Sequence, residues 1–218
     1  MPALIMQKFS FPINADYAKK NNELLKDTKR LQLSAGLFGL IQVLIGVALF
    51  LVLGGIFGGI VFTLFIVMAL ISFAMIAIIP KKVGTAESLY QNYPLAAGMI
   101  AEVNPRDFVV MALVNANVDE QAPPAWALAT RSITNLEGVE RAVGVRIPVV
   151  AVAGQRSVHS QDTWDQISPM PIGWATTDPA VVERAIKEIP DEQWKILEKS
   201  LTRLEDVKET KFDLLVID

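Results

Sequence analysis

The sequence predicts a membrane protein with two parts: a two-helix transmembrane hairpin and a cytoplasmic α+β domain. Residues 31–79 contain no Asp, Glu, Lys or Arg, and a stretch of 49 residues suffices for two crossings, because one crossing takes about 20 residues. After it, apolar and polar residues alternate before a helical period begins, which is typical of a small curved β-sheet or barrel followed by two helices and a final strand. We therefore expect an N-terminal cytoplasmic segment and helix at 1–30, the hairpin at 31–79, and the cytoplasmic domain at 80–218.

The apolar stretch divides into two spans of similar length. The first is expected at Leu31–Leu53, which as a helix is about 34 Å long and crosses a bilayer with some tilt. Gly54–Gly59 contains four glycines and favours a reversal, because glycine adopts backbone angles that other residues avoid. The second span is expected at Ile60–Ile79 and should end at Pro80, because proline interrupts a helix.

The distribution of charge predicts the orientation of the hairpin. Residues 1–30 have a net charge of +3, Lys81 and Lys82 follow the second span, and the connecting loop has no cation. The positive-inside rule then places both ends of this multi-pass protein in the cytoplasm, with the hairpin in the cell membrane. Residues 83–218 have a net charge of −8, so we expect no nucleic-acid partner, because neutralising phosphates takes clustered cations.

The N-terminal segment ends in a predicted helix. Met1–Ile13 is mildly apolar and is expected to lie on the membrane or on a partner. Asn14 is a typical N-cap residue, and Ala15–Arg30 should form a helix that continues directly into the first span.

The cytoplasmic domain begins with predicted strands. Gly98–Val103 and Phe108–Val118 flank the turn sequence Asn104–Asp107, which is typical of two strands joined by a turn. Pro148 suggests that its strand lies at a sheet edge or contains a bulge, because proline donates no hydrogen bond to a neighbour. Further strands are expected at Trp126–Ile133, Val145–Ala153, Ile172–Thr176 and Phe212–Ile217.

Two helices are predicted before the final strand. Asp178 should cap the first helix, with Pro179 at its first position. Pro190 should open the second helix. Apolar residues at helical spacing support both: Val181, Val182, Ala185, Ile186 and Ile189 in the first, and Trp194, Leu197, Leu201 and Leu204 in the second.

The sequence predicts no catalysis, cofactor or metal. The chain has no cysteine and one histidine, which argues against thiolate, zinc and haem sites. Glu102, between apolar neighbours, is the carboxylate that most resembles an acid–base group, although an outward-facing position explains it as well. One loop contains the residue types of a nucleophile–base–acid set, but the members of such a set usually come from separate elements. These loop residues are Ser157, His159, Ser160 and Asp162.

Eight residues are candidates for binding a protein partner. Gln42 should lie near mid-membrane, where an amide needs a hydrogen-bond partner from the sister span or from another protein. Arginines suit bidentate contacts to carboxylates or phosphates, although ordinary pairing with neighbouring acids is the simpler explanation. The tryptophans could form an exposed docking patch or belong to the core. The candidates are Gly39, Gln42 and Gly46 in the first span, and Arg106, Arg146, Arg156, Trp126 and Trp174 in the domain.

Two runs of sequence carry a resemblance to a known group. With the hairpin and Asn21–Glu23, the runs Ile147–Val152 and Ser168–Thr176 resemble an uncharacterised family of actinobacterial two-span membrane proteins. That family brings no catalytic residues. Small two-span proteins of this kind are similar, by analogy of size and topology, to supernumerary subunits of the actinobacterial cytochrome bcc–cytochrome oxidase supercomplex.

The functional hypothesis is a non-catalytic accessory or assembly subunit of a larger membrane complex, such as that respiratory supercomplex. Its partners would be integral membrane proteins and the lipid bilayer. The alternative is a membrane-anchored enzyme or small-molecule sensor with a β-barrel-like cytoplasmic domain. Transport ranks third, because the spans offer no ionisable residue for a pathway.

The predicted topology can be tested with reporter fusions. Reporters placed before Met1 and after Asp218 should both read cytoplasmic, and one inserted at Phe57 should read external, because the cations flank the hairpin on one side only. An external reading for the fusion after Asp218 would contradict the prediction.

Overall fold

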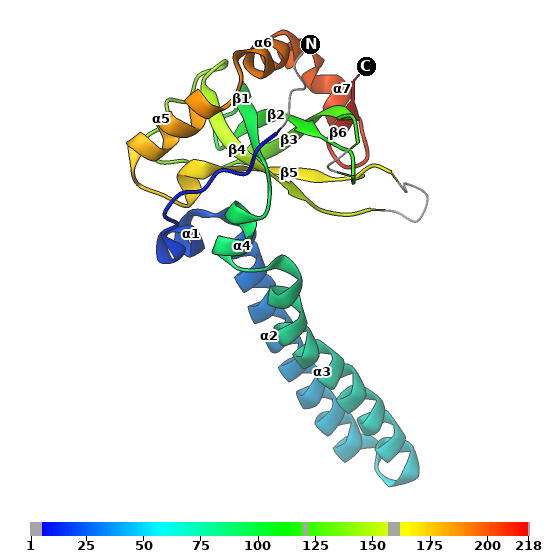
Figure 1. Cartoon of the computed structure of the whole chain (residues 1–218). Coiled ribbons are helices and arrows are strands. Elements are labelled where there is room, and N and C mark those ends of the chain that lie inside the picture. The colour runs from blue at the N-terminus through cyan, green and yellow to red at the C-terminus, as the bar shows by residue number, and fades with distance from the viewer. Residues whose placement is uncertain (1–5, 120–121, 157–161, 218) are drawn as a thin grey trace. The chain divides into compact units, whose positions relative to one another are not determined.

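The computed structural model describes residues 6–119, 122–156 and 162–217, which fall into two compact units (Figure 1). The half-barrel unit comprises Met1–Asn22 and Ala86–Asp218, and the hairpin unit comprises Glu23–Thr85. The N-terminal residues therefore fold with the C-terminal domain, and the hairpin is an insertion in the chain of the half-barrel unit.

The hairpin unit consists of two long antiparallel helices, α2 (Glu23–Leu53) and α3 (Gly55–Val83), that pack side by side (Figure 1). Both helical segments are long and apolar enough to cross a membrane, and only 17% and 11% of their most apolar stretches are buried. A core helix of a soluble protein would be mostly buried. The exposed apolar faces therefore fit a lipid environment.

The reversal between the helices is tighter than expected, and α3 extends beyond both ends of the expected second span, so the expectation that Pro80 ends this helix was wrong. Of the four glycines in Gly54–Gly59, only Gly54 and Gly55 have positive φ angles, +60° and +53°, so α3 begins at once and already contains Gly58. At its other end α3 continues through Pro80 to Val83.

Pro80 is tolerated inside α3 because a side chain of α2 replaces its missing hydrogen bond. Proline has no backbone N–H, so it cannot donate to the carbonyl of Ile76 four residues earlier. The Nε2 atom of Gln32 donates to that carbonyl oxygen over 2.8 Å. Gln32 thereby satisfies a backbone acceptor and ties the first turns of α2 to the last turns of α3.

In the described part of the half-barrel unit, six strands form one antiparallel sheet in the order β5-β4-β1-β2-β3-β6. The central strand β2 is buried along nearly its whole length, so both faces of the sheet are covered there. The strands are β1 (Leu95–Val103), β2 (Phe108–Asn115), β3 (Trp126–Ile133), β4 (Arg146–Ala153), β5 (Ile167–Pro171) and β6 (Leu214–Val216).

The sheet curls into a half-barrel, as the sequence predicted. Strands β3 and β5 are separated by three strands in the sheet order, yet Nη1 of Arg131 on β3 donates to Oγ of Ser168 on β5 over 2.6 Å. The same guanidinium lies 5.1 Å from the ring centre of Trp174. These contacts join side chains across the curved sheet.

Helices at the C-terminal end of the chain pack against strands β1 to β4 of the sheet (Figure 1). Helix α5 (Pro179–Glu188) contacts β4, α6 (Asp191–Ser200) contacts β1 and β2, and α7 (Leu204–Lys208) contacts β3. The expected caps are confirmed, since Asp178 Oδ1 accepts from the Ala180 N–H over 2.9 Å and Pro190 precedes α6. The remaining short helices are α1 (Ala15–Asn21), α4 (Ala86–Gln91), η1 (Ile172–Trp174) and η2 (Leu201–Arg203).

The expectation that the N-terminal segment lies on a membrane or a partner was wrong for its aromatic residues. Phe9 and Phe11 are 2% and 6% exposed, and their rings stack 5.5 Å apart within the half-barrel unit. Asn14 caps α1 as predicted, with its Oδ1 accepting from the Tyr17 N–H over 3.0 Å. However, α1 ends before Asn22, whose extended backbone separates it from α2, so no continuous helix runs into the first span.

Asn22 and Tyr90 fasten the two points where the chain leaves the half-barrel unit and returns to it. Both residues are fully buried, and Nδ2 of Asn22 donates to the Tyr90 hydroxyl over 3.0 Å. That hydroxyl donates to the carbonyl oxygen of Pro171 over 3.1 Å. The bond to Pro171 attaches both connection points to the edge strand β5.

Two strand predictions need correction. Strand β4 is not an edge, because it lies between β5 and β1. The Ala151 N–H donates to the carbonyl oxygen of Pro94, on the β1 side of the strand. Because successive residues of a strand direct their backbone N–H groups to opposite sides, the nitrogen of Pro148, three residues earlier, faces β5. Pro148 lies beyond the last β4–β5 pair, so no ladder bond is lost. A strand at Ile172–Thr176 was also wrong: this edge strand is Ile167–Pro171, and η1 follows it.

The pairing of Gln32 with the carbonyl that Pro80 frees predicts an energetic coupling. Gln32→Leu should destabilise the hairpin by about 1 kcal/mol, a typical size for a polar pair between membrane helices. In a Pro80→Ala background the same change should cost much less, because alanine restores the backbone donor to Ile76. Unfolding of the full chain by SDS in detergent measures both. An equal cost in the two backgrounds would contradict the pairing.

Candidate functional site

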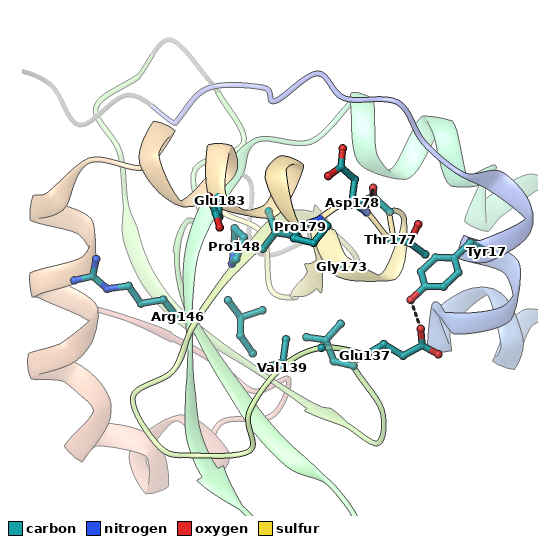
Figure 2. A pocket seen from close by; sticks show the side chains of 15 residues that line it. Tyr17, Glu137, Val139, Arg146, Pro148, Gly173, Thr177, Asp178, Pro179 and Glu183 are labelled. Atoms are coloured by element: carbon teal, nitrogen blue, oxygen red, sulfur yellow. Dashed lines mark hydrogen bonds between the residues drawn. The ribbon is translucent and has the colours of Figure 1, made fainter.

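The half-barrel unit contains a cavity of about 300 Å³ between α1, the β3–β4 loop, β4 and the start of α5 (Figure 2). Most of its walls are apolar side chains, with carboxylates, threonines and one arginine among them. The lining residues are Tyr17, Leu136, Glu137, Gly138, Val139, Arg146, Ile147, Pro148, Gly173, Thr176, Thr177, Asp178, Pro179, Val182 and Glu183.

Local sequence features shape this cavity. The Asp178 cap and Pro179 at the first helical position begin α5 at its wall. In the β3–β4 loop, Gly138 has a φ of +74°, which glycine adopts readily. A Cβ atom on Gly173 would lie 3.1 Å from Cδ1 of Leu136, so these two residues pack closely at the wall.

A hydrogen bond between Tyr17 and Glu137 links α1 to the β3–β4 loop at the cavity (Figure 2). The Tyr17 hydroxyl donates to Oε2 of Glu137 over 2.9 Å. Partial burial of the phenol, and then the bond to the Glu137 carboxylate and its charge, raise the pKa of Tyr17 to about 12. The phenol is therefore protonated at neutral pH and acts as a hydrogen-bond donor.

Negative charge predominates around the cavity. Glu137, Asp178 and Glu183 are exposed carboxylates, and Arg146 is the cation among the described lining residues. The Arg146 guanidinium lies 5.1 Å from the ring centre of Trp194 on α6. Figure 2 shows its side chain extending away from Tyr17 and Glu137. The rim of the cavity, where these three carboxylates lie, is therefore suited to a positively charged group.

A second, smaller cavity of about 80 Å³ lies where the N-terminal segment meets the turn between α5 and α6. It is lined in part by Gln193, whose side chain is 1% exposed. Among the described residues, its Oε1 is the buried side-chain polar atom that lacks a hydrogen-bond partner. The space and the free acceptor suit an ordered water molecule.

The three candidate residues of the first span all face the second span of the same chain. A Cβ atom on Gly39 would lie 2.8 Å from Cε1 of Phe73, and one on Gly46 would lie 2.8 Å from Cβ of Phe65. The Oε1 atom of Gln42 accepts from Oγ of Ser72 over 2.9 Å. Substitutions at these positions would disturb the hairpin first, and a role in binding another protein stays a prediction.

The candidate tryptophans and arginines of the domain differ in their burial and in whether they line the cavity. Trp174 is fully buried and donates its Nε1–H to the Asn135 carbonyl, so of its two expected places the core is confirmed and the exposed docking patch was wrong. Trp126 is half-buried, and Arg106 and Arg156 are exposed, so a partner role for these three stays a prediction. Of the eight candidates, only Arg146 lines the cavity.

Of the residues considered for chemistry, the structure describes Glu102 and Asp162. Ser157, His159 and Ser160 lie outside the described residues. Glu102 binds Lys208 over 2.6 Å and also accepts from Asn104, and these contacts lower its pKa, so it remains charged at neutral pH. Across the described ranges, no group of three or more His, Asp or Glu residues could hold a metal ion.

Sequence reasoning missed most of the cavity. Tyr17, Glu137 and Glu183 have no motif and lie far apart in the chain, so no local signal groups them. Asp178 and Pro179 were recognised, but only as a helix start. Their meeting depends on α1 packing against the domain.

The sequence comparison identifies the family. A family model described as "Protein of unknown function (DUF3239)" matches residues 81–205, which is more than half of the chain. The chain belongs to the DUF3239 family. The matched range includes Glu137, Asp178 and Glu183, whereas Tyr17 precedes it. No match was found among curated proteins.

One solved structure is similar to this DUF3239 protein: the crystal structure of a "putative membrane protein" from Corynebacterium diphtheriae. It shares 64% sequence identity at a TM-score of 0.55, and the alignment covers 56% of this chain and 99% of that chain. The predicted resemblance to an uncharacterised actinobacterial family is thereby confirmed at this level. The likeness to supercomplex subunits stays a hypothesis.

The raised pKa of Tyr17 predicts an alkaline titration. In this DUF3239 protein the phenol should ionise near pH 12 rather than near 10, and the stability from its protonated form, complete below pH 10, should be lost as pH rises through 12. The difference in ultraviolet absorbance between the wild type and Tyr17→Phe isolates this transition. Glu137→Gln should lower the midpoint only in part, because burial is the larger cause. A titration midpoint near pH 10 in the wild type would contradict the burial of the Tyr17 phenol and its hydrogen bond to Glu137.

Proposed function

We propose that this protein is a non-catalytic accessory or assembly subunit of a larger membrane complex. The hairpin unit would hold it in the bilayer, and the half-barrel unit would bind a partner on the cytoplasmic side. The observation that carries the proposal is the preformed cavity of about 300 Å³. Apolar walls with a few placed polar groups are characteristic of a binding site.

The polar groups at the cavity favour binding over catalysis. An efficient general acid or base has a pKa near the operating pH. Tyr17 has a pKa of about 12, and its hydrogen-bond partner Glu137 is engaged by the phenol. Asp178 caps α5. These side chains serve to position the walls of the cavity and to present charge.

The chemistry of the hairpin unit supports an anchoring role. Gln42 is bonded to Ser72 and Gln32 to the Ile76 carbonyl, so these polar side chains are satisfied between the two helices. The outward surface is apolar, as at Ile56, which is 87% exposed. Such a hairpin needs no further helix to be stable in lipid. Partner recognition therefore falls to the half-barrel unit.

The host that we would test first is the actinobacterial cytochrome bcc–cytochrome oxidase supercomplex. Two features support this choice of host: the two apolar helices of the hairpin and the similarity to a protein of Corynebacterium diphtheriae. The host's identity should come directly from purification.

A membrane-anchored small-molecule sensor is the second candidate. The cavity favours it, since about 300 Å³ is the lower end of the range for small-ligand sites. A sensor would bind a diffusible compound and would not require a stoichiometric protein partner.

Affinity purification separates these functions. The chain with a tag after Asp218, extracted from native membranes in mild detergent, should co-purify integral membrane proteins in fixed stoichiometry, which mass spectrometry would identify. Deleting the protein should reduce the amount of assembled host complex and leave the turnover of each remaining complex nearly unchanged. Membranes from an untagged strain provide the background. A free monomer or homodimer without a partner would refute the accessory role and favour the sensor.

A further inference from the structure

We propose that the cavity binds a short basic and apolar segment from a cytoplasmic loop of a partner membrane protein. One apolar side chain would enter the cavity, and a lysine or arginine beside it would meet the carboxylates at the rim. This inference rests on the proposed function and specifies the partner class for the same site.

The rim has one carboxylate that is free to pair with a partner. Glu137 accepts from Tyr17, and Asp178 accepts from a backbone N–H of α5. Glu183, about one helical turn further along α5, is exposed, and its carboxylate has no hydrogen bond or ion pair with the described residues. A cation near Glu183 would also be attracted by the other two carboxylates.

The cation of the cavity does not cancel this charge. Arg146 stacks on Trp194 and extends away from Tyr17 and Glu137 (Figure 2). A phosphate or an acidic peptide would therefore face three carboxylates and one guanidinium among the lining residues. The charge around the cavity favours a basic partner.

The walls require an apolar group as well. Leu136, Pro148 and Val182 present aliphatic surface to the cavity. Burying an aliphatic side chain there would contribute about 25 cal/mol per Å² of apolar surface removed from water. A bare inorganic cation would leave this surface unused, so the occupant should combine charge with an apolar body.

Cytoplasmic loops of membrane proteins have this chemistry. They carry an excess of lysine and arginine close to the ends of apolar helices. Residues 83–218 have a net charge of −8 and are tethered at such a surface by the hairpin. A diffusible organic cation would need neither the anchor nor the acidic domain. Charge complementarity therefore favours a loop segment.

The test measures peptide binding to the full chain in detergent micelles. The probe is a fluorescent peptide in which leucines alternate with lysines and arginines, compared with a counterpart that has glutamates in place of the cations. Glu183→Lys should weaken binding of the basic peptide about tenfold or more, and Glu183→Gln should weaken it less. Glu192→Lys makes the same charge change on the exposed side of α6, outside the cavity, and should have little effect.

Several outcomes would overturn the inference. Equal losses from Glu183→Lys and Glu192→Lys would indicate general attraction to an acidic domain. Equal binding of the acidic peptide would show that the carboxylates around the cavity do not select a basic partner. Full competition by benzylammonium at the peptide's own concentration would identify a small organic cation as the occupant.

Purification separates this inference from the proposed function. If the tagged wild-type chain retains membrane-protein partners and the Glu183→Lys chain loses them while the Glu192→Lys chain keeps them, the inference is supported. If all three retain their partners, the accessory role stands and the cavity is not the contact. If the wild type has no partner, the proposed function itself fails.

Discussion

The buried hydrogen bonds among Asn22, Tyr90 and Pro171 are the constraint on which the rest of the structure depends. The hairpin is inserted between residues 22 and 86, so the half-barrel unit can close only if its exit and entry points are held together. Burial raises the pKa of Tyr90 and keeps its phenol protonated, so it donates to Pro171 while it accepts from Asn22. This arrangement brings the N-terminal segment to the sheet, and with it Phe9, Phe11 and the helix that contributes Tyr17 to the cavity.

The hairpin unit follows a related rule, because polar groups in a membrane must find partners within the protein. Gln42 accepts a hydrogen bond from Ser72. Gln32 donates to the carbonyl oxygen of Ile76, which has no backbone donor because Pro80 lacks an N–H. Gly39 and Gly46 let the rings of Phe73 and Phe65 approach the backbone of α2. Close packing and polar pairing thus stabilise the hairpin, as expected where hydrophobicity does not distinguish lipid from protein. Between Leu31 and Ile79, its outer surface is largely apolar and carries no charged side chain.

The two parts of the chain differ in the sign of their charge. Cations flank the spans, whereas residues 83–218 have a net charge of −8. The arginines of the domain lie largely against aromatic rings, as Arg131 does on Trp174 and Arg146 on Trp194. Such stacking uses the flat face of the guanidinium and buries its stem. Carboxylates such as Glu183 are then left to set the charge around the cavity.

The sequence by itself determined the two apolar helices, the β3 strand and the starts of α5 and α6, because each depends on composition, periodicity or a cap within a few residues. It ended the second helix at Pro80, although α3 continues to Val83, where Gln32 donates the hydrogen bond that proline cannot. It placed the edge strand at Ile172–Thr176 instead of Ile167–Pro171, whose prolines are tolerated at a sheet edge. It also left Trp174 undecided between a docking patch and the core, and it missed the cavity. Only the tertiary structure decided these features, because burial and the meeting of Tyr17, Glu137 and Glu183 depend on contacts between segments far apart in the chain.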